Sequence, residues 1–108
     1  FFVDFSGLAV RSLADVERIR EGVETRLAPI GHKVNAVVNY DRFSIVPELV
    51  DDYIAMVKDI MERHYHDVTR YTANTFLRMK LGEAMEKHQI PPRLYENADE
   101  AQGSLGKA

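Results

Sequence analysis

The chain has 108 residues, of which 45% are hydrophobic and 29% are charged, a balance typical of one globular domain. Fourteen basic and 17 acidic residues give a net charge of −3, so the sequence carries no electrostatic signature of binding to nucleic acid or to anionic lipid. The lack of cysteine excludes a disulfide framework, thiol catalysis and a thiolate metal site. No apolar run approaches the roughly 18 residues needed to cross a membrane, and no signal peptide is in view. We therefore expect a cytoplasmic protein with one domain over residues 1–101 and a frayed tail at 102–108, and neither a membrane nor a nucleic-acid partner.

The first predicted element is a buried strand over residues 1–5, which starts at the first residue. Because a natural N-terminus rarely begins within a strand, we expect a piece of a longer polypeptide whose chemistry lies upstream. The hydroxyl of Ser12 predicts the N-cap of a helix, with Asp15 near the positive end of the helix dipole. Pro29 and Gly31 predict its end. The apolar stripe of this helix is Leu13, Val16, Ile19, Val23, Leu27 and Ile30.

Strands and helices then alternate along the chain. We expect a strand at 34–38, a loop at 39–45, a helix whose first turn holds Pro47, and a strand at 67–71. Asn74 or Thr75 caps a third helix, and the sequence ends with a short edge strand at 94–95 and a helical turn after Asn97. The apolar face of the third helix is Leu77, Leu81, Ala84 and Met85. This order predicts an α/β fold with a small, mostly parallel sheet of about four strands and about three to four helices.

Ligands of parallel α/β sheets bind beyond the carboxyl ends of the strands, which directs attention to the loops at 6–12, 39–46 and 72–75. The most site-like stretch lies around the start of the third helix. There, Arg70, Thr72, Asn74 and Thr75 form a candidate site for a phosphate or a carboxylate. The alternative is that Asn74 and Thr75 only cap the helix, since the stretch has no glycine-rich phosphate cradle.

Other candidates have structural alternatives too. Asp41, in a strand-end loop, is the best placed carboxylate for acid–base catalysis, although a helix-start acid needs no catalytic role. His64 and His66 have the spacing of a metal-ligand pair but lack an evident third ligand, so we expect no metal and no cofactor. Tyr40 and Phe43, in a predicted loop, are candidate interface residues. No catalytic constellation emerges from these residues.

Several blocks of the chain, in order, carry a family resemblance. They are residues 2–8 (FVDFSGL), 15–20 (DVERIR), 38–41 (VNYD), 68–72 (VTRYT) and 76–82 (FLRMKLG). These blocks resemble the C-terminal extension of long bacterial acyl-CoA:acetate/3-ketoacid CoA-transferases, over nearly the whole chain. The resemblance implies a parent that exchanges coenzyme A between an acyl-CoA and a carboxylate through a glutamyl-CoA thioester.

In that family the nucleophilic glutamate and its glycine-rich loops lie in two preceding catalytic domains, and none of them maps onto this sequence. The resemblance therefore implies a non-catalytic accessory domain that acts in packing, assembly or regulation. Its partners would be the upstream catalytic domains or another subunit of a homo-oligomer. A CoA- or anion-binding module is the alternative within the same parent.

A second resemblance concerns shape. Residues 3–8 followed by Ser12, and residues 94–101 at the other end, are similar to the start and the close of STAS domains, the fold of anti-sigma-factor antagonists. In those antagonists a serine at this helix start can be phosphorylated, and Ser12 is the matching position. Arg11 replaces the acidic neighbour usual there, and a plain N-cap also explains Ser12. The resemblance implies a STAS-like fold and, as a further alternative, a regulatory interaction module.

Overall fold

The structure, a computed structural model, describes residues 1–105 and centres on a four-stranded sheet. The strand order is β1 (Phe2–Asp4), β3 (Val34–Asn39), β5 (Tyr65–Tyr71) and β6 (Leu94–Tyr95), and every neighbouring pair is parallel. The predicted α/β fold with a small parallel sheet is confirmed. β1 and β6 form the two edges of this sheet, which makes 94–95 the edge strand that the sequence predicts.

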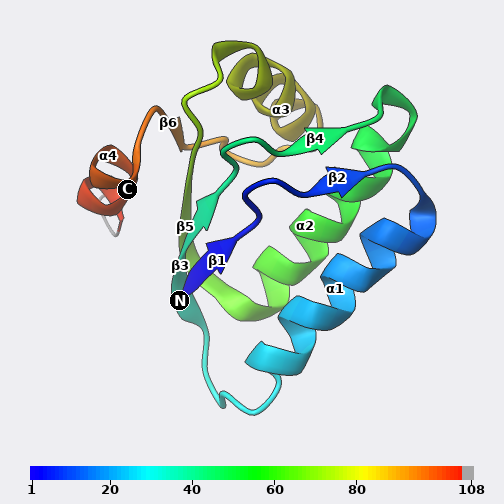
Figure 1. Ribbon diagram of the computed structural model, residues 1–108. Coiled ribbons are helices and arrows are strands. Elements are labelled where there is room, and N and C mark those ends of the chain that lie inside the picture. The colour runs from blue at the N-terminus through cyan, green and yellow to red at the C-terminus, as the bar shows by residue number, and fades with distance from the viewer. Residues whose placement is uncertain (106–108) are drawn as a thin grey trace.

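The helices cover the sheet unequally. α1 (Leu13–Leu27) and α2 (Val50–His64) lie side by side on one face (Figure 1). α3 (Thr75–Lys87) packs against α2 and β6, whereas α4 (Ala98–Ser104) lies on the opposite face, mainly against β5 and β6. Within the described residues, no helix combines the length and the apolar character required to span a bilayer.

Side-chain caps set the starts of three helices. Ser12 Oγ accepts from the Asp15 amide at 3.3 Å, and Asn74 Oδ1 accepts from the Leu77 amide at 3.0 Å. Asn97 Oδ1 accepts from the Glu100 amide at 2.9 Å. All three caps are predicted by the sequence, because a short polar side chain can satisfy an N–H group that has no partner within the helix. α4 continues to Ser104, beyond the predicted single turn, so 102–104 are helical rather than frayed, while residues 106–108 of the predicted tail lie outside the described residues.

The core lies between the sheet and the first three helices. The predicted apolar face of α3 is buried in full, and so is most of the predicted stripe of α1, namely Val16, Ile19, Val23 and Leu27. Leu13 is an exception, with 59% of its surface exposed at the first position of α1. Helical periodicity therefore identified the buried faces well, since it depends only on which residues share a stripe.

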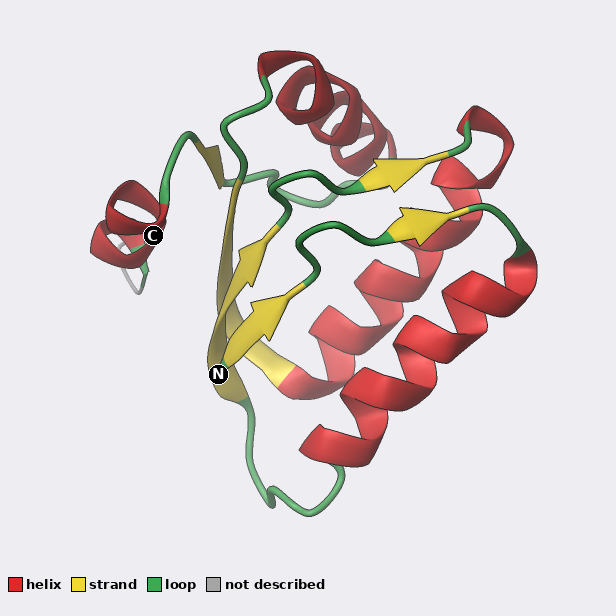
Figure 2. Cartoon of the chain, in the orientation of Figure 1, coloured by secondary structure: helices red, strands yellow, loops and turns green. Residues whose placement is uncertain are grey.

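The loops predicted at 6–12 and 39–45 contain a second, smaller sheet. β2 (Ala9–Val10) pairs in parallel with β4 (Ser44–Ile45), and Figure 2 shows them as two short arrows side by side. The prediction of a loop at 39–45 is wrong for Asn39, which ends β3, and for Ser44–Ile45, because a two-residue strand is too short to show a sequence period. Pro47 begins a single 3₁₀ turn (Pro47–Leu49) that leads into α2.

The first strand is less buried than its sequence suggests. Phe1 and Phe2 are 40% and 55% exposed, and only Val3 in β1 is buried. The reason is that β1 is an edge strand with one covered face, and successive side chains of a strand point to opposite faces. The predicted strand is confirmed for Phe2–Asp4, but the prediction that it is buried is wrong except at Val3.

Candidate functional site

Polar groups at the carboxyl ends of β1 and β3 bind one another. Asp4 Oδ1 accepts from the Ser6 amide at 3.0 Å and from Asn39 Nδ2 at 3.4 Å. Asn39 Oδ1 in turn accepts from the Asp41 amide at 2.8 Å. The hydrogen bonds from Ser6 lower the pKa of Asp4, which keeps its carboxylate charged. The two strand ends are thus tied together by their own side chains.

Asp41, the candidate acid–base residue, has a structural partner. Its Oδ1 accepts from the amide of Ala73 at 2.8 Å, which joins the loop after β3 to the turn before α3. This carboxylate therefore occupies a main-chain donor that an anion at the start of α3 would need, and it places negative charge beside the predicted anion site. Asp41 acts here as a link between two loops.

The predicted anion site assembles only in part. Thr72, Asn74 and Thr75 do meet at the start of α3, but Asn74 caps Leu77 and its own amide donates to Thr72 Oγ1 at 3.2 Å. The arginine at this helix start is Arg78, whose Nη1 donates to the Thr72 carbonyl at 2.6 Å and whose Nη2 donates to Thr75 Oγ1 at 3.2 Å. The sequence signal for Arg78 was its position one helical turn after Asn74, a spacing that brings two residues onto one face.

Arg70 lies elsewhere, so its assignment to the anion site is wrong. It is 1% exposed, and its guanidinium donates to the Pro92 carbonyl and to Met61 Sδ, both at 3.0 Å. The pleat of β5 explains this placement, because Thr69 and Arg70 point to opposite faces. Thr69 Oγ1 donates to the Ala101 carbonyl of α4 at 2.9 Å, whereas Arg70 faces α2. Arg70 therefore points into the core and away from the start of α3.

A cluster of tyrosines surrounds this buried arginine. The hydroxyls of Tyr40 and Tyr53 are 2.7 Å apart, and both side chains are fully buried. Burial raises the pKa of Tyr40, raises that of Tyr53 further, and raises the pKa of Tyr65 to about 12; it lowers the pKa of Arg70. No ion pair of residues 1–105 includes Arg70, so neutral groups make up its immediate partners.

Tyr40 and Phe43 belong to this core as well. They are 1% and 4% exposed, and their rings meet edge to face with centroids 5.0 Å apart. Tyr40 also contacts Phe5, at 5.9 Å between centroids. Pairing of β4 with β2 turns this segment inward over α2. The interpretation of Tyr40 and Phe43 as surface residues is therefore wrong, whereas the assignment of Tyr53 to the core is confirmed.

Two further candidate residues, Ser12 and His64, lie at the ends of helices. Ser12 is exposed and serves as the N-cap of α1. His64 Nε2 lies 3.3 Å from Nη1 of Arg63 at the end of α2. Over residues 1–105, no three or more histidine, aspartate or glutamate side chains gather in a geometry that could hold a metal ion.

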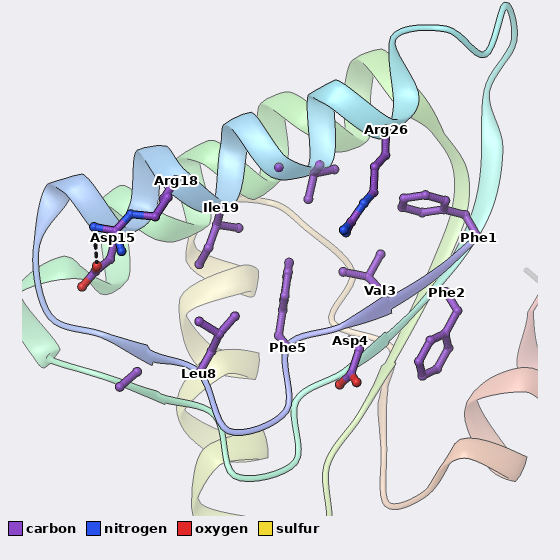
Figure 3. Close-up of a pocket in the computed structure, with 13 residues that line it drawn as sticks. Phe1, Phe2, Val3, Asp4, Phe5, Leu8, Asp15, Arg18, Ile19 and Arg26 are labelled. Carbon is purple, nitrogen blue, oxygen red and sulfur yellow. Dashed lines mark ion pairs between the residues drawn. The ribbon is translucent and has the colours of Figure 1, made fainter.

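Sequence reasoning also missed a groove of about 340 Å³ between β1, β2 and α1. Figure 3 shows Phe1, Phe5 and Leu8 lining it from the strand side, with Arg26 near one end and Asp15 near the other. Asp15 forms an ion pair with Arg18 at 3.4 Å, and the Arg11 amide lowers the pKa of Asp15. Three of the six large apolar side chains exposed in the described residues line this groove: Phe1, Phe2 and Leu8.

The groove holds no paired nucleophile and base; Asp15 and Arg18 lie at one end, Arg26 lies near the other, and Asp4 lies between them beside Val3. An exposed apolar surface with charges at its margins is typical of a protein–protein contact. In comparisons with known proteins, the chain matches no family model, no curated protein and no solved structure.

Proposed function

We propose that this chain is a non-catalytic accessory domain of a cytoplasmic CoA-transferase, and that it acts in assembly of the enzyme. The sequence blocks that resemble the C-terminal extension of long CoA-transferases support the choice of parent. The observation that carries an assembly role is the groove beside β1, where Phe1, Phe2 and Leu8 expose apolar surface. Such surface is stabilised when a protein partner removes it from water.

The polar residues at the carboxyl edge support a non-catalytic role. Asp41 is bound to the Ala73 amide, Asn74 to the Leu77 amide, and Arg70 lies in the core. A general base needs to reach a substrate proton, and an anion site needs free donors. In this structure those groups hold the fold together.

The first test uses a full-length CoA-transferase that contains this chain as its C-terminal extension. Asp41→Asn keeps the acceptor oxygen for Ala73 but removes the charge, and Asp52→Asn on the exposed side of α2 is the matched control. We expect both variants to exchange CoA at the wild-type kcat. Loss of about 10²-fold or more in a folded, assembled Asp41→Asn enzyme would show a direct role in proton transfer and contradict the proposal.

A second test removes the whole domain from the same enzyme. We expect the remaining catalytic domains to form the glutamyl-CoA thioester, because the nucleophile lies outside this segment. We also expect a change in the oligomeric mass or in the thermal unfolding temperature. A truncated enzyme with unchanged mass, stability and turnover would contradict a role in assembly.

Binding of CoA is the alternative function, and Arg78 beside Thr72 and Thr75 is the observation in its favour. Titration calorimetry of the chain with CoA, at low and high salt, decides between the two. We expect no saturable heat, because Asp41 and Asn74 already accept from the amides at this helix start. Saturable binding that Arg78→Met and salt both weaken would replace the accessory role with ligand binding.

A further inference from the structure

The open edge of β1 presents main-chain groups in a fixed pattern. The Phe5 amide donates to the Asn39 carbonyl of β3 at 3.0 Å, and the Phe1 carbonyl also accepts from β3. Because alternate residues of a parallel strand hydrogen-bond to the same side, the amides and carbonyls of Phe2 and Asp4 point away from β3. These groups can bind a further strand. A partner that covered them without main-chain groups of its own would take them out of water unpaired, which is costly.

Arg26 brings a positive charge to the groove beside this edge. Figure 3 shows its side chain pointing from α1 into the groove, above Val3 and between Phe1 and Phe5. Arg26 takes part in none of the ion pairs found within residues 1–105. Its place in the last turn of α1 suits the helix dipole, but the dipole does not require the guanidinium to lie over the groove. A carboxylate that enters here meets a cation that is free to form a charge-assisted hydrogen bond.

The other charged residues that line the groove leave this position to Arg26. Asp15 and Arg18 form an ion pair with each other at the far end, at 3.4 Å. Asp4 lies on the face of β1 that is turned away from α1, where its carboxylate accepts from the Ser6 amide. On the side of the sheet that faces α1, the charge beside β1 is therefore that of Arg26.

Gly22 keeps the helix side of the groove open. It lies within α1 and lines the groove, and a Cβ placed there would meet nothing within 4 Å. Glycine within a helix is less favourable than alanine, and neither crowding nor a positive φ requires glycine at this position. The space left by the missing side chain is open to a group from outside the chain.

We propose that β1 and this groove bind an extended segment of a protein partner, which joins the sheet as a strand antiparallel to β1 and places a carboxylate side chain opposite Val3. The main-chain groups of the segment pair with those of Phe2 and Asp4. Because side chains alternate along a strand, the residue opposite Val3 lies on the face next to α1, and its carboxylate binds Arg26. The strand supplies the hydrogen bonds, and the acid sets the specificity.

The register predicts the rest of the recognised sequence. The residues two positions before and two positions after the acid lie on the same face, opposite Phe5 and Phe1, and are apolar. On the other face, the residue before the acid lies opposite Asp4 and is basic, and the residue after it lies opposite Phe2 and is apolar. Phe2 is 55% exposed, so this last contact removes apolar surface from water. The order is apolar, basic, acidic, apolar, apolar.

This inference rests on the assembly role proposed above and adds the chemistry of the contact. The two can fail separately, because removal of the domain from the parent enzyme tests assembly, whereas the test below uses the chain and a peptide. A peptide that does not bind overturns this inference and leaves the assembly role standing. A peptide that binds, with a parent enzyme whose assembly and stability do not change when the domain is removed, does the reverse.

The probe is the blocked peptide acetyl-Thr-Val-Lys-Glu-Val-Val-Thr-amide, titrated to about 5 mM into the isotope-labelled chain at low salt. We expect saturable chemical-shift changes at the Phe2 and Asp4 amides. Replacement of the glutamate of the peptide by glutamine should weaken binding at least about threefold.

A double-mutant cycle isolates the ion pair. Arg26→Gln should weaken the glutamate peptide by the same factor and leave the glutamine peptide unchanged. Arg11→Gln removes the same charge from an exposed arginine outside the groove and is the matched control, which should bind both peptides like the wild type. Equal weakening by Arg26→Gln and Arg11→Gln would overturn the proposal.

Variants of Gly22 test the position of the segment. Gly22→Leu fills the groove and should weaken the glutamate peptide at least about fivefold, whereas Gly22→Ala should change its affinity by less than about twofold. Alanine and leucine favour helix more than glycine does, so both variants keep the fold. A Gly22→Leu chain that binds the peptide as well as Gly22→Ala does would contradict the proposed position.

Two further outcomes would overturn the proposal. One is the lack of saturable binding up to about 5 mM peptide, or shifts that leave out Phe2 and Asp4. The other comes from sodium decanoate, an aliphatic carboxylate without main-chain groups. Binding of decanoate in the groove, without binding of the peptide, would assign the site to an amphiphile instead of a protein segment.

Discussion

Replacement of Arg70 distinguishes a buried structural arginine from one that has a ligand-binding role. The side chain is 1% exposed and reaches Pro92 and Met61, with Tyr40 and Tyr53 beside it. A guanidinium stays charged in proteins, so the fold carries the desolvation cost of this cation without a carboxylate partner among residues 1–105. Arg70→Met keeps a long apolar stem and removes the charge, whereas Arg70→Ala removes both.

The expected sizes follow from these contacts. Arg70→Met loses the hydrogen bond to the Pro92 carbonyl, which costs about 1–3 kcal/mol if that group is left unpaired. Relief of the desolvation cost offsets this loss, and replacement of buried charges by apolar side chains is often neutral or stabilising. We expect a net change of less than about 1.5 kcal/mol, as for other volume-conserving core substitutions. Arg70→Ala leaves a cavity in the core and should destabilise the protein by about 2–5 kcal/mol.

Urea unfolding followed by circular dichroism measures both free energies. The two variants share the loss of charge, so their difference isolates the packing of the stem. If Arg70→Met destabilises the chain as much as Arg70→Ala does, the charge itself is net stabilising and the desolvation argument is refuted. Calorimetry with CoA on Arg70→Met adds a functional check, since a core arginine should leave any ligand binding unchanged.

Three further outcomes are expected. Ser12→Ala should lower the free energy of unfolding by about 1 kcal/mol while Ser12→Asp retains the cap of α1, and equal losses in urea would contradict the capping role. The pKa of Asp15 is lowered below 3.8, chiefly by the hydrogen bond from the Arg11 amide. The Asp15 carboxylate therefore stabilises the fold above that pH, and this stabilisation is lost as pH falls through the folded pKa. Asp15→Asn should flatten the dependence of the unfolding temperature on acid pH, and an unchanged slope would contradict this role of Asp15. The pKa values of Tyr40, Tyr53 and Tyr65 are raised above 10, so their contribution to folding stability is complete below pH 10 and is lost as pH rises through the folded values. Tyrosinate absorbance should therefore show that Tyr40 and Tyr53 ionise only as the chain unfolds. If the wild type and Tyr53→Phe both ionise before they unfold, the burial of these tyrosines is contradicted.

Helical periods and caps were the parts of the fold that the sequence could predict. Asn74 caps α3 and the face from Leu77 to Met85 is buried, because both features depend on residues within one or two turns of each other. Strand pairing depends on residues far apart in the chain. Ala9 and Ser44 form strands only because their segments meet, and neither segment is long enough to show a period on its own.

The candidate site illustrates the same limit at the level of single side chains. Thr69 to Thr72 were read together because they are adjacent in sequence, yet the pleat sends Thr69 toward α4 and Arg70 toward α2. A period of two along β5 does predict that neighbours separate. It does not predict which face each one meets, because that depends on where the helices cross the sheet.

The direction of the crossovers also explains why β1 exposes an apolar side chain. The sheet order β1-β3-β5-β6 follows the chain without reversal, so right-handed crossovers carry the first helices to the same face. The other face is left to α4, whose main contacts are with β5, β6 and β3 (Figure 1). β1 is therefore the strand that combines an open edge with a face that α4 does not mainly cover, and Phe2 lies there at 55% exposure.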